Sequence, residues 1–343
     1  MASDAEPSVT ILCLTDGRAG NRAQALGLGE ALARRATNRA PRPVVVREGQ
    51  VRLKRWSTLL PARGWDWAAR TVPGWPGAGL LDAAATLTAP GADLIIGAGR
   101  RAAPIVAHIG RMYDVPTVQL LDPQMDPAAF TLVAAPRHDG LEATNAVATL
   151  GSVGRVTRAS IDAAHAALPS DLSDRLHAMP RPRIAVLLGG GSNSARWSDD
   201  DEDAFVAACK ALADAGCSLI VTPSRRTDPA ITAALRSDLP TERLFLWDGA
   251  GPNPYPGMLG MADAVLVTAD SVNMASEAAA SGLPVHVFPI GHLDAKLASF
   301  HRALEEHGAA RPFTGAIESW TYAPLAEADR LAGIVSDRLP LGL

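Results

Sequence analysis

The sequence AVLVTADSVNMASEAAASGLPVHVFPIG, residues 264–291, is the stretch that decides the fold. Its apolar run 265–268 predicts a strand, the polar turn 270–273 predicts a cap for a small-residue helix, and Pro284 precedes a second strand. The start of such a helix binds phosphate, because its N–H groups are unpaired and its dipole is positive there. Glu277, on the same helix, is placed to accept hydrogen bonds from a ribose diol. The stretch therefore indicates a nucleotide site.

The same alternation of strand and helix runs along the whole chain. Short apolar runs alternate with alanine-rich stretches, which is typical of parallel sheets wound by helices. The expected strands are residues 9–15, 43–47, 94–97, 117–121, 132–135, 184–188, 219–222, 244–247, 264–268 and 285–288. Prolines and charges at 168–183 precede a new apolar strand and predict a domain boundary near 180–182. We expect an α/β protein with two Rossmann-like domains, 1–180 and 181–343, with the option that a C-terminal helix packs back on the first domain.

Composition limits the classes of function. The chain has 343 residues, of which 48% are hydrophobic and 20% charged, enough for two cores. Its net charge of −4 argues against nucleic acid as a main partner. Three scattered cysteines fit a reducing compartment. The sequence shows no apolar run of transmembrane length and no signal peptide, so we expect a cytoplasmic location.

The arrangement of strand, Asp-Ser turn, helix with Glu, Gly-Leu-Pro and strand resembles the nucleotide-binding half of GT-B type glycosyltransferases. The chain also resembles the mitochondrial-fission "elongated mitochondria" family. The motifs that carry this resemblance are LTDGRAGNRAQALGLGEAL (14–32), LLDPQ (120–124), APRHD (135–139), LGGGSN (188–193) and TPSRRT (222–227). The resemblance implies two Rossmann-like domains whose parallel sheets face a central cleft.

Further turns of the second domain follow strands and open onto the same sheet edge. The turn GGGSN lets the backbone approach a diphosphate closely, and the alternative is a plain strand–helix turn. In TPSRRT an arginine neutralises a phosphate, or the pair is merely solvated. In GT-B enzymes the loop corresponding to Trp247 touches the base, and the alternative is a tryptophan that anchors the loop. The expected donor-site residues are Gly190, Gly191, Ser192, Asn193, Arg225, Arg226, Trp247, Asp270, Ser271, Asn273 and Glu277.

The first domain supplies two candidates for a general base. Asp16 follows the first strand, where GT-B acceptor domains place a loop facing the cleft; a role as cap for the helix beginning near Asn21 is the alternative. His138 ends the strand 132–135 and has a suitable intrinsic pKa, whereas a lone loop histidine is more often structural. Arg18, Asn21 and Gln24 are candidate acceptor or phosphate contacts.

Residues 51–81 hold four of the seven tryptophans, interleaved with five basic residues. Such a mixture suits a membrane interface or a lipid-linked acceptor, or simply a subdomain with tryptophan inside and arginine outside. The strand–helix turn 97–101, which contains Arg100 and Arg101, is a candidate for binding an anionic part of either substrate, and the favoured alternative is an ordinary glycine turn before a helix. The acid run 199–203 stands at a helix start, where the dipole favours acids, so we expect neither a metal site nor a cofactor.

The resemblance to GT-B enzymes, together with these features, implies a metal-independent glycosyltransferase. Its donor is a nucleotide-sugar, with a UDP-sugar as the first choice, and its acceptor is unidentified, with a lipid-linked molecule as one option. Peripheral contact through 51–81 at the inner face of the membrane is a hypothesis. Two alternatives stay open: a nucleotide-sugar epimerase of the same fold, and a noncatalytic membrane-associated scaffold.

Overall fold

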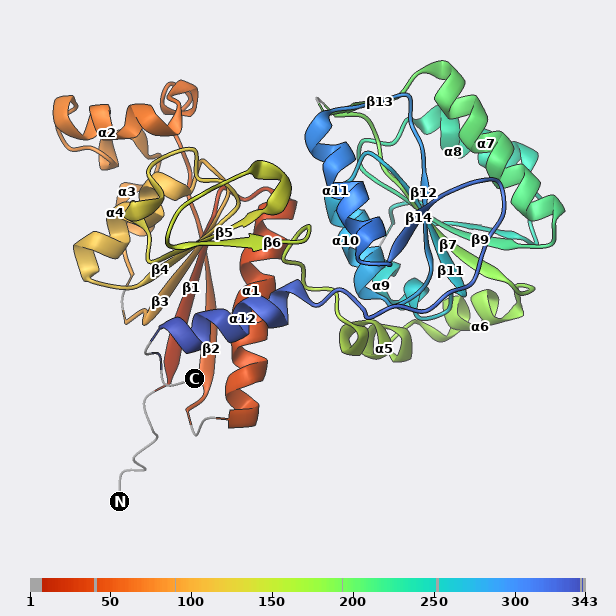
Figure 1. Ribbon diagram of the computed structural model, residues 1–343, viewed down its shortest axis with the longest axis horizontal. Coiled ribbons are helices and arrows are strands. Elements are labelled where there is room, and N and C mark those ends of the chain that lie inside the picture. Colours follow the sequence, from red (N-terminus) through yellow and green to blue (C-terminus); the bar gives the residue numbers. More distant parts are fainter. Residues whose placement is uncertain are drawn as a thin grey trace. The chain divides into compact units, whose positions relative to one another are not determined.

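The computed structural model describes residues 8–39, 42–89, 91–192, 194–250, 253–339 and 341. The chain forms two compact units. Unit 1 consists of residues 1–155 together with 327–343, and unit 2 consists of residues 156–326. Each unit has its own parallel sheet with helices on both faces (Figure 1).

Unit 1 contains a six-stranded parallel sheet in the order β2-β1-β3-β4-β5-β6. Its strands are β1 (Val9–Thr15), β2 (Val44–Gln50), β3 (Leu94–Ala98), β4 (Thr117–Leu120), β5 (Leu132–Pro136) and β6 (Ala146–Thr149). Its α-helices are α1 (Ala19–Arg39), α2 (Ala62–Thr71), α3 (Ala83–Thr86), α4 (Ala103–Tyr113) and α12 (Glu327–Arg338). Short 3-10 helices are η1 (Ser57–Leu59), η2 (Gly77–Gly79), η3 (Pro127–Ala129) and η4 (Arg137–Asp139).

The two faces of this sheet are buried by different parts of the chain. Helices α1 and α12 cover one face, where Leu28 and Leu32 meet Leu331 and Val335 in one buried cluster. Helix α4 and the segment that contains α2 cover the other face, with Ile105 and other α4 residues at the centre. Because both faces are covered, the central strands β3, β4 and β5 are buried along their whole length, whereas the edge strand β2 is only partly buried.

Unit 2 contains a second six-stranded parallel sheet, in the order β10-β9-β7-β11-β12-β14. Its strands are β7 (Arg183–Leu188), β9 (Ser218–Pro223), β10 (Leu244–Leu246), β11 (Ala264–Thr268), β12 (Val285–Phe288) and β14 (Ala310–Pro312), with the antiparallel pair β8 (Ala195–Arg196) and β13 (His292–Leu293) beside it. Its helices are α5 (Arg158–Ala166), α6 (Ser170–Ala178), α7 (Asp199–Asp214), α8 (Pro229–Asp238), α9 (Tyr255–Leu259), α10 (Val272–Ala280) and α11 (Ala295–Glu306). Helices α7 and α8 lie on one face and α10 and α11 on the other, as right-handed crossovers require (Figure 1).

All ten expected strands are present, with ends that differ by at most a few residues. The α/β class with two Rossmann-like parallel sheets is thereby confirmed. The expected domain boundary at 180–181 falls inside unit 2, because α5 and α6 belong to that unit. Gly257 of α9 touches Leu168 and the Ala164 carbonyl so closely that a β-carbon there would lie within 2.8 Å of them. The C-terminal helix α12 belongs to unit 1.

Candidate functional site

The strand order of unit 2 reverses between β7 and β11, the place where open α/β sheets bind ligands. A buried hydrogen-bond network closes the loops that follow these two strands. The Gly190 N–H donates to Asp270 Oδ2 at 2.8 Å, and the Thr268 hydroxyl donates to Asp270 Oδ1 at 2.6 Å. The Gly189 N–H donates to Thr268 Oγ1 at 2.9 Å. Asp270, only 5% exposed, therefore holds the glycine-rich turn in place.

The glycine-rich turn packs directly on the loop that carries the two arginines. A β-carbon on Gly190 would lie 2.2 Å from the Arg226 carbonyl, so only glycine fits at this position. Thr227 ties the same loop to the turn by donating to the Gly189 carbonyl at 2.6 Å. Arg225 and Arg226 are both exposed. The structure thus brings the predicted glycine turn, the predicted arginine pair and Asp270 together at one sheet edge.

Helix α10 begins at this edge. Ser271 is its N-cap and accepts a hydrogen bond from the Met274 N–H at 3.3 Å, and Asn273 lies half-buried in the first turn. Glu277 lies one turn further along and is partly exposed. Burial raises the pKa of the Glu277 carboxyl to about 7, although the neighbouring Tyr255 hydroxyl acts in the opposite direction. Tyr255, at the start of α9, was not predicted from the sequence.

Two further predicted residues of unit 2, Trp247 and Ser192, make hydrogen bonds within their own loops. The Trp247 indole N–H donates to the Ala250 carbonyl at 3.2 Å, and its ring packs against the cluster around Phe245 and Met258, so it anchors the loop after β10. Ser192 accepts a hydrogen bond from the Ser194 N–H at 3.2 Å. Asn193 lies outside the described residues. His301, which sequence analysis missed, supports the site from α11 by contacting the Ala269 carbonyl at 2.7 Å.

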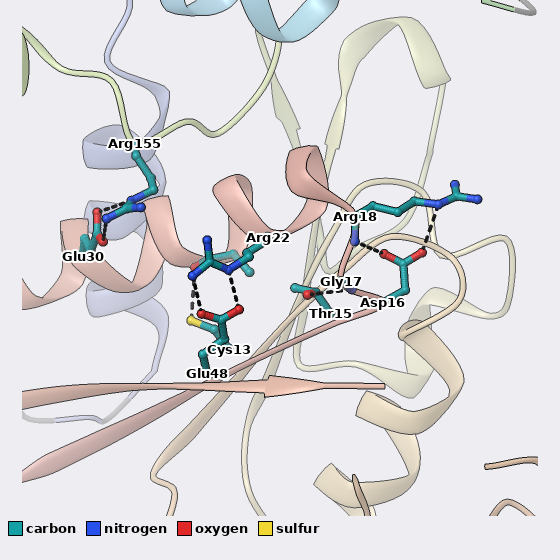
Figure 2. Close-up of polar contacts among 10 residues, drawn as sticks. Cys13, Thr15, Asp16, Gly17, Arg18, Arg22, Glu30, Glu48 and Arg155 are labelled. Carbon is teal, nitrogen blue, oxygen red and sulfur yellow. Dashed lines mark hydrogen bonds and ion pairs between the residues drawn. The ribbon is translucent and has the colours of Figure 1, made fainter. Parts of the chain in front are cut away.

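In unit 1 the strand order reverses between β1 and β3, and Asp16 stands at that point. Its side chain is only 6% exposed and accepts a hydrogen bond from Asn21 Nδ2 at 2.9 Å. Arg18 pairs with Asp16 at 3.5 Å, and the guanidinium group points away from the helix (Figure 2). Asn21 also lies against Gly99, in the turn after β3. Asp16, Arg18 and Asn21 therefore form one cluster at the carboxyl edge of the sheet.

The other two predicted residues of unit 1 lie apart from this cluster. Gln24 is 6% exposed and accepts from the Val153 N–H at 3.4 Å, so it joins α1 to the segment after β6. His138 lies half-buried in η4, after β5. Strands β3 and β4 lie between β1 and β5, which places the Asp16 and His138 backbones roughly 14 Å apart by strand spacing. The two candidate bases therefore follow strands that are three positions apart in the sheet.

The acid run at the start of α7 has structural partners. Asp201 accepts hydrogen bonds from the Ser198 and Gly291 N–H groups, both at 2.9 Å, and Ser198 caps the helix. Within the described part of the chain, no group of three or more His, Cys, Asp or Glu side chains is placed to hold a metal ion. Over the same residues, no helix combines the length and apolar character needed to cross a membrane.

Solved structures of UDP-sugar enzymes share this architecture. The UDP-GlcNAc 2-epimerase of Methanocaldococcus jannaschii superposes with a TM-score of 0.56 at 10% identity, covering 96% of this chain and 100% of that one. MnaA of S. aureus, solved with UDP, superposes with a TM-score of 0.53 at 13% identity, covering 97% and 90%. At such low identity the likeness concerns the fold alone, and it confirms the expected GT-B-like class.

Sequence comparison then gives the family. The profile described as "Mitochondrial fission ELM1" matches residues 19–339, so the chain belongs to the mitochondrial fission ELM1 family. The mitochondrial fission protein ELM1 of Arabidopsis thaliana is 31% identical over 262 residues, which cover 68% of this chain. The match spans only 60% of the length of that plant relative. The family resemblance expected from the motifs is confirmed.

Proposed function

We propose that unit 2 binds a nucleoside diphosphate sugar, with a UDP-sugar as the first choice, and that the protein transfers the sugar to an acceptor. The observation that carries this proposal is the buried Asp270 network, which fixes the glycine turn after β7 beside the N-terminus of α10. The N–H groups in the first turn of α10 and the dipole of that helix are suited to a diphosphate at this sheet edge. Arg225 and Arg226, exposed on the adjoining loop, supply positive charge for the same group.

Glu277 is the residue we assign to the ribose. It lies about one turn inside α10, beyond the helix start that would take the phosphates. An ionised carboxylate accepts hydrogen bonds from both hydroxyls of a diol, and a charge-assisted bond is stronger than a neutral one. The S. aureus protein of the same fold, solved with UDP, supports uridine as the base to test first.

For the chemical step, Asp16 and His138 are alternative general bases. The base removes the proton of the acceptor hydroxyl as that oxygen attacks the anomeric carbon, while the helix dipole and arginines stabilise the leaving diphosphate. Asp16 is the better supported of the two, because Asn21 and Arg18 hold its carboxylate in one orientation. We expect Asp16→Asn to lower kcat by about 10²- to 10⁴-fold and to leave the Kd for the donor unchanged. If His138→Asn lowers kcat in this way and Asp16→Asn does not, His138 is the general base.

The first experiment is calorimetric titration of the protein with UDP, UDP-GlcNAc, UDP-glucose, GDP and CMP. We expect selective binding of uridine nucleotides, lost in Glu277→Ala. Glu305→Ala, which removes an exposed glutamate of α11, is the matched control and retains binding. Absence of binding to every nucleotide would overturn the proposal and favour a noncatalytic scaffold.

Turnover assays then separate the enzymatic alternatives. Release of UDP that depends on an added acceptor supports transfer. Conversion of the UDP-sugar without an acceptor identifies an epimerase, which shares the donor site but needs acid and base groups on both faces of the sugar. Binding without either reaction leaves the protein as a nucleotide-sugar-binding module.

A further inference from the structure

Unit 1 contains a cavity of about 230 Å³ that neither the proposed donor-site residues nor the two candidate bases line. One wall comes from the segment around η1 and α2, and the other from the turns after β3 and β4. This volume is below the roughly 300–1,000 Å³ of pockets that enclose a whole small ligand. The cavity therefore suits one part of a larger molecule whose remainder stays outside.

The wall at the sheet edge is basic. Arg100 and Arg101 line it, and Arg100 Nη1 donates to Gln124 Oε1 at 3.4 Å. Among the residues that the structure describes, neither arginine has an ion pair with a carboxylate. Gln124 has a φ of 54°, a left-handed conformation that is costly for a residue other than glycine and that clusters at ligand sites. This wall is suited to an anionic group.

The opposite wall combines the hydroxyl residues Ser57 and Thr58 with apolar side chains, and its apolar part continues outward. Trp65, 5% exposed, and Leu53 line it, and Leu59 stands at its rim with 83% of its surface exposed. Leu59 has the highest exposed fraction of any large hydrophobic side chain in the described part of the chain, and Trp56 in the same turn is 46% exposed. Leucine and tryptophan exposed beside arginine are typical of a surface that lies in a membrane interface.

The segment that supplies the apolar part of the wall has a basic sequence. Residues 51–81 contain five basic and one acidic residue, although the whole chain has a net charge of −4. A neighbouring cavity, which shares Gln124 and Pro61 with this one, is lined by the acidic residues Asp122, Asp126, Asp139 and Glu142 instead of arginines. Basic segments of this kind are attracted to anionic lipids.

We propose that this cavity binds the phosphate-bearing headgroup of an anionic membrane lipid, held by Arg100 and Arg101, while Leu59 and Trp56 enter the membrane interface. The basic wall explains the affinity for the headgroup, the small volume explains why only the headgroup is enclosed, and the exposed rim explains where the acyl chains remain. The lipid site lies wholly in unit 1 and does not depend on nucleotide binding by unit 2.

The test is co-sedimentation of the full chain with vesicles of phosphatidylcholine, with and without phosphatidic acid. We expect binding only to the mixed vesicles. Arg100→Ala and Arg101→Ala should each weaken it about fivefold, the effect of one basic residue at an anionic surface. Leu59→Ser should weaken it as well. Arg111→Ala and Met112→Ser, which change exposed residues of α4 outside the cavity, are the matched controls and bind like the parent.

Several results would overturn the proposal. Equal binding to both kinds of vesicle excludes headgroup recognition, and unchanged binding by Arg100→Ala and Arg101→Ala excludes this cavity. Calorimetry with glycerol 3-phosphate tests whether the cavity binds a soluble phosphate compound instead of a lipid. Binding of glycerol 3-phosphate without binding to vesicles would assign the cavity to a soluble ligand. Each variant is also checked by circular dichroism, so a variant that fails to fold is recognised directly.

Discussion

Asp270 shows how one buried carboxylate organises the loops of unit 2. It accepts hydrogen bonds from the Gly190 N–H and the Thr268 hydroxyl, and it lies so close to Gly189 that a β-carbon there would be 2.0 Å from Oδ2. Sequence analysis placed Asp270 among the ligand contacts. The structure gives it protein partners instead, so we now assign it a positioning role beneath the proposed diphosphate site.

We expect Asp270→Ala to lower the free energy of unfolding by about 2 kcal/mol, because it leaves the buried Gly190 N–H without an acceptor and leaves the Thr268 hydroxyl only the Leu187 carbonyl at 3.5 Å. Urea denaturation followed by circular dichroism measures the change. Asp203→Ala, at an exposed position on α7, should change the free energy by less than about 0.5 kcal/mol. A loss as small as that of the control would show that the network contributes little to stability.

Glu277 predicts a pH dependence of nucleotide binding. Its pKa of about 7 means that the carboxyl is largely protonated at pH 6 and largely ionised at pH 8. A diol donates hydrogen bonds to the ionised form, so affinity for UDP should rise about tenfold between pH 6 and pH 8 beyond any effect of the phosphate itself. Titration of Glu277→Gln over the same range isolates the phosphate contribution. Parallel pH profiles for parent and variant would refute this assignment.

The same group affects stability with the opposite sign. Its pKa in the folded protein lies above the ordinary 4.5, so the unfolded chain releases the proton first as the pH rises. The free energy of unfolding should therefore fall between about pH 4.5 and pH 7, by roughly 2 kcal/mol, since partial exposure of the side chain reduces the full value of the shift. Glu277→Gln should lack this decrease in urea denaturation at a series of pH values. A decrease of equal size in the variant would assign it to other groups.

At the scale of elements, the turn after β7 packs closely on the turn after β9 because Gly190 has no side chain. Gly190 lies against the Arg226 backbone, whereas a β-carbon on the adjacent Gly191 would have its nearest neighbour, the Ala195 carbonyl, at 3.7 Å. Of these two adjacent glycines, only Gly190 lies at a position where a side chain would clash with the turn after β9.

We expect Gly190→Ala to displace the 224–227 loop, because backbone atoms at 2.2 Å must move to admit a methyl group. Overpacking of this kind costs about 1–3 kcal/mol. UDP affinity should fall together with stability, as measured by calorimetry and urea denaturation. Gly191→Ala should retain both properties. If the two variants behave alike, the packing of the two turns is not what shapes the site.

The sequence predicted elements well wherever a buried apolar run was bounded by turns. The strands missed were β6, β8, β13 and β14, which have two to four residues and lack a distinct apolar run. Tyr255 was missed because its contact with Glu277 joins α9 to α10 across the intervening β11, and no local pattern records such a contact. The boundary expected at 180–181 rested on local composition. The grouping of α5 and α6 with unit 2 rests instead on packing such as that between Gly257 and Leu168, which are distant in sequence.

At the scale of the whole molecule, the chain returns from unit 2 to unit 1 and ends there in α12. Glu327, at the start of this helix, is 8% exposed and accepts a hydrogen bond from the Leu150 N–H at 3.0 Å. Arg330 pairs with both of its carboxylate oxygens, at 2.8 and 2.7 Å. Residues Leu331 and Val335 then complete the core beneath α1. The core of unit 1 is therefore built from two segments that are far apart in the sequence.

We expect Glu327→Ala to destabilise unit 1 by about 2–3 kcal/mol, because it leaves the buried Leu150 N–H unpaired and removes the partner of Arg330. Each unit has a core of its own, so hydrogen exchange should accelerate in peptides from β1, β6, α1 and α12 and stay unchanged in peptides from β7 and β11. Asp329→Ala, which removes only an exposed ion pair with Arg34, should cost less than about 1 kcal/mol and alter neither set. Equal acceleration in both units would mean that they unfold as one cooperative body, whereas unchanged exchange throughout would mean that the apolar contacts of α12 alone hold it in place.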